Sequence, residues 1–175
     1  MDYCVYQSPV GPLTLVASAL GLAGLYFEEH QHFQQPEHWR RQNQSVLFQE
    51  VQNQLDAYFA GTRQHFDLPL DISSGTAFQR AVWQALLTVP YGQTASYAQI
   101  AQQIGRPAAV RAVGAANGRN PLSIVVPCHR IIASNGALTG YAGGLLNKTY
   151  LLQHEAVKAA TASTDATSAQ GLMAA

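Results

Sequence analysis

Apolar and polar residues alternate over residues 3–27, with the two-residue period of a half-buried β-strand. The stretch VYQSPVGPLTLVAS surrounds a Pro-Val-Gly-Pro turn, and GLAGLYF follows it as a return strand. The next segment, HQHFQQPEHWRRQNQ, is polar without a clear period, which predicts a loop or a short helix. The pattern therefore predicts a small β-sheet at the amino-terminal end of the chain.

Helical spacing first appears over residues 46–60. Apolar residues one turn apart form a stripe there: Leu47, Val51, Leu55 and Phe59. Gly61 follows as a C-terminal stop, since glycine readily adopts the left-handed conformation that ends a helix. The segment HFDLPLD then alternates again and predicts a strand over Phe66, Leu68 and Leu70.

The composition changes near DISSGT, residues 71–76, toward alanine, glycine and arginine. We place a domain boundary there, between residues 1–71 and 72–157. Thr76 is expected to cap a helix that ends before Pro90. Its inward residues should be Phe78, Val82, Ala85, Leu86 and Val89.

Two further helices are predicted, one from Ser96 to Gln103 and one from Pro107 to about Gly118, joined by a turn at Gly105. Two short helices joined by a tight turn resemble a helix-turn-helix, although such pairs also occur as plain packing units. The segment SIVVPCHRII predicts a buried strand that breaks at Pro127, and NKTYLLQHEA predicts a final helix. Residues 158–175 are small and polar, and we expect a disordered tail.

Charge is distributed unevenly along a chain of 175 residues whose net charge is zero. Residues 1–71 carry eight carboxylates and three arginines, whereas residues 72–154 carry six basic residues and no acid. Such a stretch is the electrostatic footprint expected for binding a polyanion, although chance in a weakly charged sequence is the alternative.

The sequence contains no run of eighteen apolar residues and begins without a basic segment followed by an apolar one. We therefore expect neither a membrane span nor a signal peptide. The two cysteines, Cys4 and Cys128, are interpreted as reduced thiols, and we expect the protein to be cytoplasmic.

Cys128 is the residue with the clearest chemical signal. It follows a proline that interrupts an apolar run, and His129 and Arg130 come directly after it. A thiol reacts as its thiolate, and a neighbouring imidazole or guanidinium lowers its pKa. Adjacent side chains point apart on a regular strand, so His129 can assist only if the backbone bends or a water bridges the two groups. A buried structural cysteine is the alternative.

The string VPCHRII resembles the active-site signature of the O6-alkylguanine-DNA alkyltransferases. The resemblance extends over roughly residues 75–156, through SYAQIA, RAVGAANGRNP and TGYAGG, and VGPLTLVA and GLAGLYF fit the family's first domain. It implies an α/β fold with a small ribonuclease-H-like sheet domain, followed by a mostly helical domain that holds the helix-turn-helix. It also implies direct-reversal repair, in which each molecule irreversibly takes one alkyl group from O6-alkylguanine, or from O4-alkylthymine, onto Cys128.

The same resemblance implies a role for each matching residue. His129 would act as a base through water, Glu155 would hold it, and Asn120 would support the active-site turn. Tyr97 would rotate the phosphate and donate to guanine N3. Arg111 would enter the duplex in place of the flipped nucleotide, with Ala112 and Gly114 beside it on the DNA face. Tyr141, Ala142, Gly143 and Gly144 would line the base pocket.

The third predicted helix, PAAVRAVGAAN, carries almost no side chain that could read base edges, which favours double-stranded DNA binding with little sequence preference. Ala142 stands where some family members have serine, so a hydroxyl contact to O6 is lost. Cys4 and the scattered histidines match no metal-ligand spacing, and we expect no metal, no cofactor and a monomer. Two rival functions stay open: a lesion-binding protein without transfer activity, which would lack the acceptor cysteine, and a Cys-His hydrolase, which would turn over.

Overall fold

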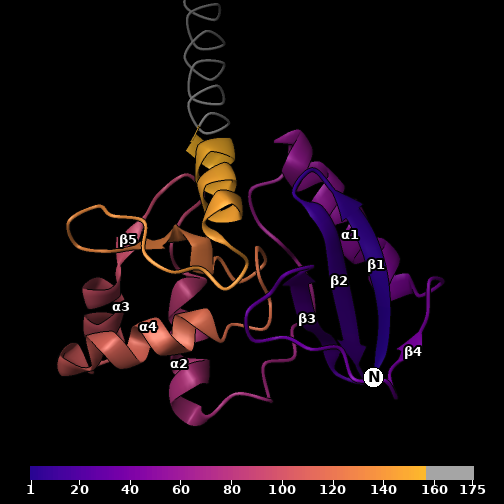
Figure 1. The fold of residues 1–175 in the computed structure, drawn as a ribbon, viewed down its shortest axis with the longest axis horizontal. Helices are drawn as coiled ribbons and strands as arrows, with labels where there is room; N and C mark the ends of the chain where they lie inside the picture. The colour runs from indigo at the N-terminus through magenta and orange to yellow at the C-terminus, as the bar shows by residue number, and fades with distance from the viewer. Residues whose placement is uncertain (157–175) are drawn as a thin grey trace, which may run out of the picture.

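In the computed structural model, which describes residues 1–156, three antiparallel strands form most of the amino-terminal sheet (Figure 1). They are β1 (Asp2–Ser8), β2 (Gly11–Ser18) and β3 (Gly21–Phe27), as the alternating pattern predicts. A fourth short strand, β4 (Arg40–Arg41), pairs in parallel with β1, giving the order β3-β2-β1-β4. This strand lies in the segment predicted as a loop or a short helix, and an ion pair of 2.9 Å joins Arg40 to Asp2 beside it.

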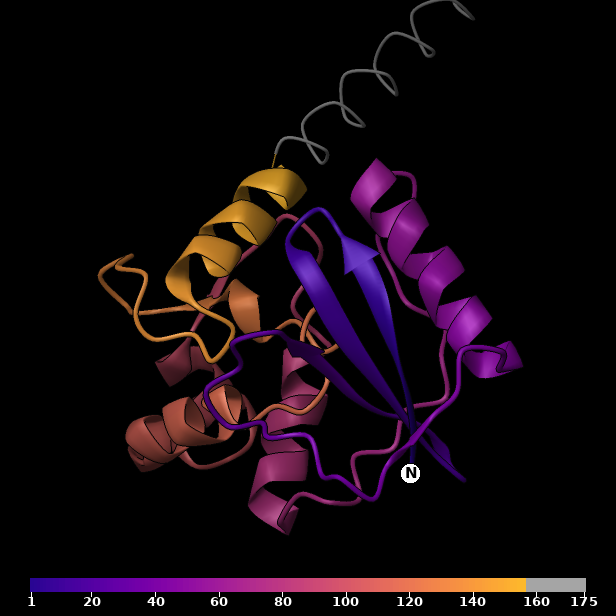
Figure 2. The same ribbon diagram turned by 45° about the vertical axis from the view of Figure 1, so that its right-hand side comes forward.

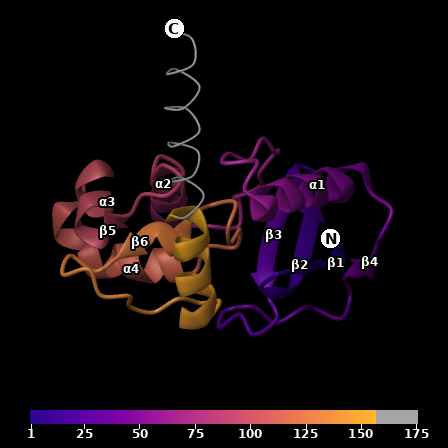
Figure 3. The same ribbon diagram turned by 90° about the horizontal axis from the view of Figure 1, so that it is seen from above.

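Helix α1 (Val46–Ala60) covers one face of the sheet (Figures 2 and 3). Val51 and Leu55 are buried as predicted, but Leu47 and Phe59 are only half-buried. The helix is turned so that the aromatic residues Phe48 and Tyr58 occupy the inner face. The predicted stripe and the observed one both have helical spacing. The observed stripe, which consists of Phe48, Val51, Leu55 and Tyr58, buries more aromatic surface. Gly61 ends the helix with a left-handed φ of 79°, as predicted.

The strand predicted over HFDLPLD is wrong. Only Leu70 forms an isolated parallel bridge, with Leu22 of β3. Pro69 has no N–H to donate, so this segment bonds to β3 through one carbonyl and one amide and does not form a continuous ladder of hydrogen bonds. Leu22 N–H donates to Pro69 O at 2.8 Å, and Asp71 N–H donates to Leu22 O at 2.8 Å.

The helical domain contains α2 (Ala77–Leu86), α3 (Tyr97–Gln103) and α4 (Val110–Gly118), and α4 is preceded by the short helix η1 (Pro107–Ala109). Capping boxes begin α2 and α3, where Thr76 pairs with Gln79 and Ser96 with Gln99. These N-terminal signals explain why the starts of both helices agree with the prediction. Of the inward-facing residues predicted on and just after α2, only Phe78 is less than fully buried. A last helix covers residues 145–156.

The strand predicted over SIVVPCHRII is also wrong, although its residues are buried as expected. Ile124 has a left-handed φ of 71°, and Val125 N–H donates back to Ser123 O at 2.8 Å, which closes a tight turn. After Pro127 comes the 3-10 turn η2 (Cys128–Arg130), and only then the two-residue strand β6 (Ile131–Ile132), which pairs in parallel with β5 (Ala95–Ser96).

The two domains are joined along the outer edge of β3. Leu25 N–H donates to Pro121 O at 2.8 Å, and Ser123 N–H donates to Leu25 O at 3.1 Å. The segment leading to Cys128 thus continues the amino-terminal sheet. No helix within residues 1–156 is long and apolar enough to cross a membrane. The predicted disordered tail, residues 158–175, lies outside the described residues.

Candidate active site

Cys128 is held by a tightly folded backbone. Pro127 has φ −80° and ψ 61°, and Cys128 N–H donates to Val126 O at 2.8 Å, which is the geometry of an inverse γ-turn. Asn120 braces this turn, because its Nδ2 donates to Val126 O at 2.8 Å and its Oδ1 accepts from Leu122 N–H at 3.0 Å. Asn117 Nδ2 donates to Cys128 O at 3.3 Å. The backbone bend that the dipeptide Cys128-His129 requires is therefore present.

The Cys128 thiol is almost completely enclosed, with 4% of the residue exposed. Burial raises its pKa, because a thiolate is poorly solvated inside the protein. The side chains of Asn120 and Tyr141 and the charge of Lys148 act in the opposite direction. The protein therefore keeps a thiol at rest, next to groups that stabilise the thiolate.

His129 is fully buried, and its Nε2 lies 2.8 Å from Glu155 Oε1. Burial lowers the pKa of His129, and the hydrogen bond to Glu155 opposes that shift. The other ring nitrogen, Nδ1, has no hydrogen-bond partner within residues 1–156, and no direct hydrogen bond joins it to the thiol of Cys128. The imidazole is thus oriented through one nitrogen and leaves the other available.

Besides its hydrogen bond with His129, the Glu155 carboxylate accepts hydrogen bonds from three further residues. Arg130 donates to it twice, from Nε at 2.8 Å and from Nη2 at 3.0 Å. Tyr58 OH donates at 2.8 Å and Gly92 N–H at 3.2 Å. Burial raises the pKa of Glu155, but the bonds from His129 and Arg130 outweigh it and hold the pKa well below its usual range. Glu155 is therefore a carboxylate at neutral pH.

Not all of the six basic residues between positions 72 and 154 are exposed on the surface. Arg130 and Lys148 are buried, and Lys148 Nζ donates to Ile131 O at 2.6 Å and to Thr139 O at 3.1 Å. Both cations form hydrogen bonds inside the protein, because a buried charge needs internal partners, and they are not available to bind a ligand at the surface. The exposed arginines of the helical domain are Arg106, Arg111 and Arg119.

Arg111 and Ala112 lie on the exposed face of α4, and Gly114 is half-buried against Tyr97. A Cβ atom at Gly114 would lie 3.8 Å from Tyr97 Cδ1, so the small residue brings α4 close to this ring. Tyr97 is the first residue of α3, and its hydroxyl accepts from Thr139 Oγ1 at 3.5 Å. The structure thus brings Tyr97, Gly114 and the loop around Thr139 together, with Arg111 alongside.

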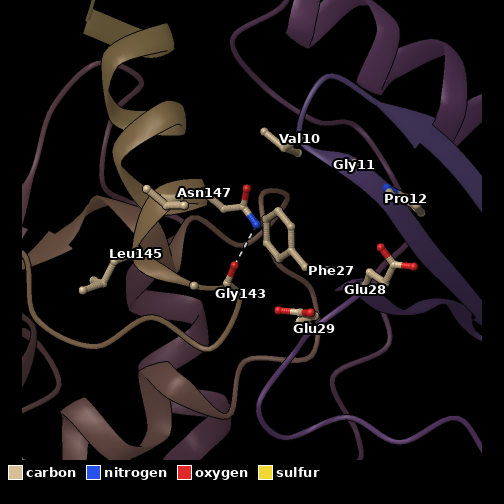
Figure 4. Close-up of a pocket in the computed structure, with 11 residues that line it drawn as sticks. Val10, Gly11, Pro12, Phe27, Glu28, Glu29, Gly143, Leu145 and Asn147 are labelled. Atoms are coloured by element: carbon tan, nitrogen blue, oxygen red, sulfur yellow. Dashed lines mark hydrogen bonds between the residues drawn. The ribbon is translucent and has the colours of Figure 1, made fainter.

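The predicted pocket residues Tyr141, Ala142 and Gly143 are buried, whereas Gly144 is exposed with φ 87°. The Tyr141 hydroxyl is buried without a hydrogen-bond partner in residues 1–156. Burial raises the pKa of Tyr141, and the nearby Cys128 thiolate would raise it further. A cleft of about 430 Å³ is lined by Gly143 together with Phe27, Glu28 and Asn147 (Figure 4). Cys128 does not line this cleft.

Several residues of the site were missed in the sequence. Arg130 was connected with Cys128 as a basic neighbour of the thiol, but its buried ion pair with Glu155 was not foreseen. Tyr58 carries no local signal, because it and its partner Glu155 are 97 positions apart. Lys148 and Asn117 bind backbone carbonyls, of Ile131 and Thr139 and of Cys128 respectively, and no sequence motif marks such contacts. Within residues 1–156, no cluster of three His, Cys, Asp or Glu residues is arranged to hold a metal ion.

Two family models match the chain. The model described as "6-O-methylguanine DNA methyltransferase, ribonuclease-like domain" matches residues 1–72, and the model of the same family's DNA binding domain matches residues 77–157. Both cysteines are free and buried. The first domain is thus the small sheet domain, and the second is the helical domain that carries Cys128.

Similar proteins extend over nearly the whole chain. The methylated-DNA--protein-cysteine methyltransferase of Mycobacterium tuberculosis is 48% identical over 91% of this chain and 94% of its own length. That of Methanosarcina acetivorans is 46% identical over 89% of this chain and 98% of its own length. The crystal structure of Mycobacterium tuberculosis OGT in complex with DNA superposes with a TM-score of 0.84 at 47% identity, covering 90% of this chain and 94% of that one. The chain belongs to the 6-O-methylguanine DNA methyltransferase family.

Proposed function

We propose that this protein repairs alkylated DNA by transferring an alkyl group from O6 of guanine, or from O4 of thymine, to Sγ of Cys128. The observation that carries the proposal is an enclosed thiol on a braced turn, next to an imidazole that a buried carboxylate orients at 2.8 Å. The relatives of known name are methyltransferases that use a protein cysteine, which agrees with this arrangement.

The transfer forms a sulfur–carbon bond and breaks the carbon–O6 bond, with the electron pair leaving on O6. The thiol proton passes toward His129 Nδ1 through a water, and Glu155 stabilises the imidazolium that results. Tyr97 gives its proton to guanine N3, so the base departs without net charge, and the imidazolium of His129 returns a proton to the Tyr97 phenolate through solvent. The net reaction therefore moves the alkyl group to sulfur and one proton to the guanine.

Contact with DNA is assigned to the exposed face of α4, with Arg111 replacing the flipped nucleotide in the base stack and Ala112 and Gly114 beside it. A thiol this deeply enclosed reacts only with a base that leaves the duplex and enters the protein. The small side chains of α4 favour close approach without base-specific hydrogen bonds, so binding should depend little on sequence.

Each molecule is expected to act once, as a monomer in the cytoplasm. A thioether is not displaced by a neighbouring thiol, and Cys4, the other cysteine, is itself buried on β1. The chemistry needs neither a metal nor a cofactor, because the acceptor is part of the chain.

Intact-mass spectrometry after mixing with an O6-methylguanine oligonucleotide tests the proposal. We expect one methyl group per molecule in the unaltered protein and in Cys4→Ser, and none in Cys128→Ser. A hydrolase would release many products per molecule, and a lesion-binding protein would bind the oligonucleotide without gaining mass. Either result, or methylation of Cys4, would contradict the proposal.

A further inference from the structure

The amino-terminal domain contacts each residue of the pocket loop, residues 141–143. Gln31 N–H donates to Ala142 O at 2.9 Å. The ring of Phe27 lies edge-on to the ring of Tyr141, with 5.8 Å between the centroids. Residues 134–140, which precede this loop, are exposed, and the chain becomes buried at Tyr141, where the amino-terminal domain covers it. The amino-terminal domain therefore contributes to the position of this loop, although Cys128 lies in the other domain.

Phe27 is a rigid support. It is the last residue of β3, it is 2% exposed, and it pairs with Leu13 of β2 in the sheet register. Figure 4 shows its ring directed toward Gly143 and Asn147. Because a strand residue paired within a sheet has little freedom to move, a loop that contacts its side chain must adapt to it.

Gly143 is the point of closest approach. A Cβ atom at this position would lie 2.2 Å from Cδ2, 2.6 Å from Cε2 and 2.9 Å from Cγ of Phe27, closer than real contacts allow. Gly143 does not have a left-handed φ, so its backbone conformation is open to any residue. The ring of Phe27, and not the backbone, is what requires glycine here.

We propose that Phe27 is a positioning residue that sets the depth of the alkyl pocket by holding Tyr141 and Gly143 at a fixed distance from the Cys128 thiol. The inference rests on the proposed function, since it assigns residues 141–143 to the pocket wall. It gives the amino-terminal sheet a part in the reaction although none of its residues touches the reacting atoms. In-line transfer tolerates little displacement of the pocket wall, because the alkyl carbon must lie within about 3–3.5 Å of sulfur.

A compensating pair of substitutions tests this idea. Gly143→Ala should drive the loop away from Phe27 and lower the single-turnover rate with free O6-benzylguanine at least tenfold. Phe27→Ala removes all three crowding atoms, so the double variant Phe27→Ala/Gly143→Ala should react at least threefold faster than Gly143→Ala. Gly140→Ala is the matched control: it lies directly before the pocket loop, has no atom within 4 Å of its added Cβ, and should react within twofold of the unaltered protein.

Two independent structural defects would instead add, and the double variant would then be slower than either single variant. Thermal unfolding checks that each variant is folded. Phe27→Val, which also removes Cδ2 and Cε2, replaces Phe27→Ala if the latter does not fold. A double variant no faster than Gly143→Ala, or a Gly143→Ala protein that reacts normally, would overturn the inference. Failure of the unaltered protein to take a methyl group from the O6-methylguanine oligonucleotide would overturn the proposed function instead.

Discussion

Replacing Glu155 with glutamine should both destabilise the protein and slow alkyl transfer. Glutamine keeps the shape of the side chain and one acceptor oxygen, but it removes the negative charge that Arg130 and His129 face. Glu155 is 1% exposed and the side chain of Arg130 is 7% exposed, so solvent screens neither group. The substitution therefore isolates the contribution of the charge.

The magnitude follows from the burial of Arg130. Breaking a buried ion pair by removing one partner costs about 3–5 kcal/mol, because the other charge stays inside without compensation. A domain of ordinary stability has about 5–15 kcal/mol in total, so the loss is a large share. Arg130 keeps one hydrogen bond, from Nη1 to Val89 O at 2.7 Å, which places the expected loss toward the lower end.

The effect on the reaction has a separate cause. Without the carboxylate, His129 keeps its buried position but loses the partner that raises its pKa and stabilises the imidazolium. General-base assistance contributes about 10²–10⁴-fold to a rate, so a loss within this range is expected for the folded variant. Urea unfolding measures the stability, and single-turnover labelling with free O6-benzylguanine at low temperature measures the rate.

The dependence on pH has a defined sign. The folded-state pKa of Glu155 is depressed, so its contribution is present above the unfolded value of 4.5 and is lost as the pH falls through the folded value. The pKa of His129 is also lowered, so the unfolded chain binds a proton below 6.5 that the folded protein does not. Stability should therefore decrease on acidification below pH 6.5 and again below pH 4.5, and Glu155→Gln should make the second decrease smaller, leaving the part that comes from Asp2 and Asp71, whose pKa values are also lowered.

Two controls separate charge from packing. Tyr58→Phe removes one hydrogen bond to Glu155 without changing any charge, and its cost should be about 1.5–3 kcal/mol. The double variant Glu155→Gln/Arg130→Met should be more stable than Glu155→Gln, since no unpaired charge remains. If Glu155→Gln costs less than Tyr58→Phe, the carboxylate does not compensate Arg130 and the reasoning is wrong.

Three further outcomes are expected. Arg111→Ala should slow repair of duplex DNA far more than labelling by free O6-benzylguanine, and equal losses would place Arg111 in the chemistry or the fold. The slope of log affinity against log salt should be about −3, as expected for three exposed arginines at about −0.9 each, and not about −5 as six would give. Ala142→Val should lower the rate with O6-benzylguanine more than with O6-methylguanine, because it narrows the alkyl pocket, and an unchanged ratio of the two rate constants would remove residue 142 from the pocket wall.

Elements with local signals were predictable from the sequence. The starts of α2 and α3 follow from Thr76 and Ser96, whose side chains satisfy backbone amides a turn later, and the end of α1 follows from Gly61. The strands β1, β2 and β3 follow from alternation around short turns. In each case the interaction that decides the element lies within a few residues of it.

The errors occurred where distant partners decide the structure. The segment before Pro127 has the composition of a strand, yet Asn120 and the edge of β3 satisfy its backbone groups, so it folds as turns. Periodicity could not choose between the two stripes of α1, because the choice depends on the sheet and on Glu155. The charge count failed for the same reason: Arg130 and Lys148 have internal partners that composition cannot show.

The proposed site depends on the amino-terminal domain at three separate places. Leu25 pairs with Pro121 and Ser123 and fixes the segment that leads to Cys128. Tyr58 donates to Glu155 and so helps to orient the imidazole of His129. Phe27 supports the pocket loop at Gly143. These contacts position the thiol, the base and the proposed pocket wall respectively, and an in-line transfer from O6 to sulfur depends on all three at once. The helical domain therefore holds every residue assigned to the chemistry, while the amino-terminal domain helps to determine their relative positions.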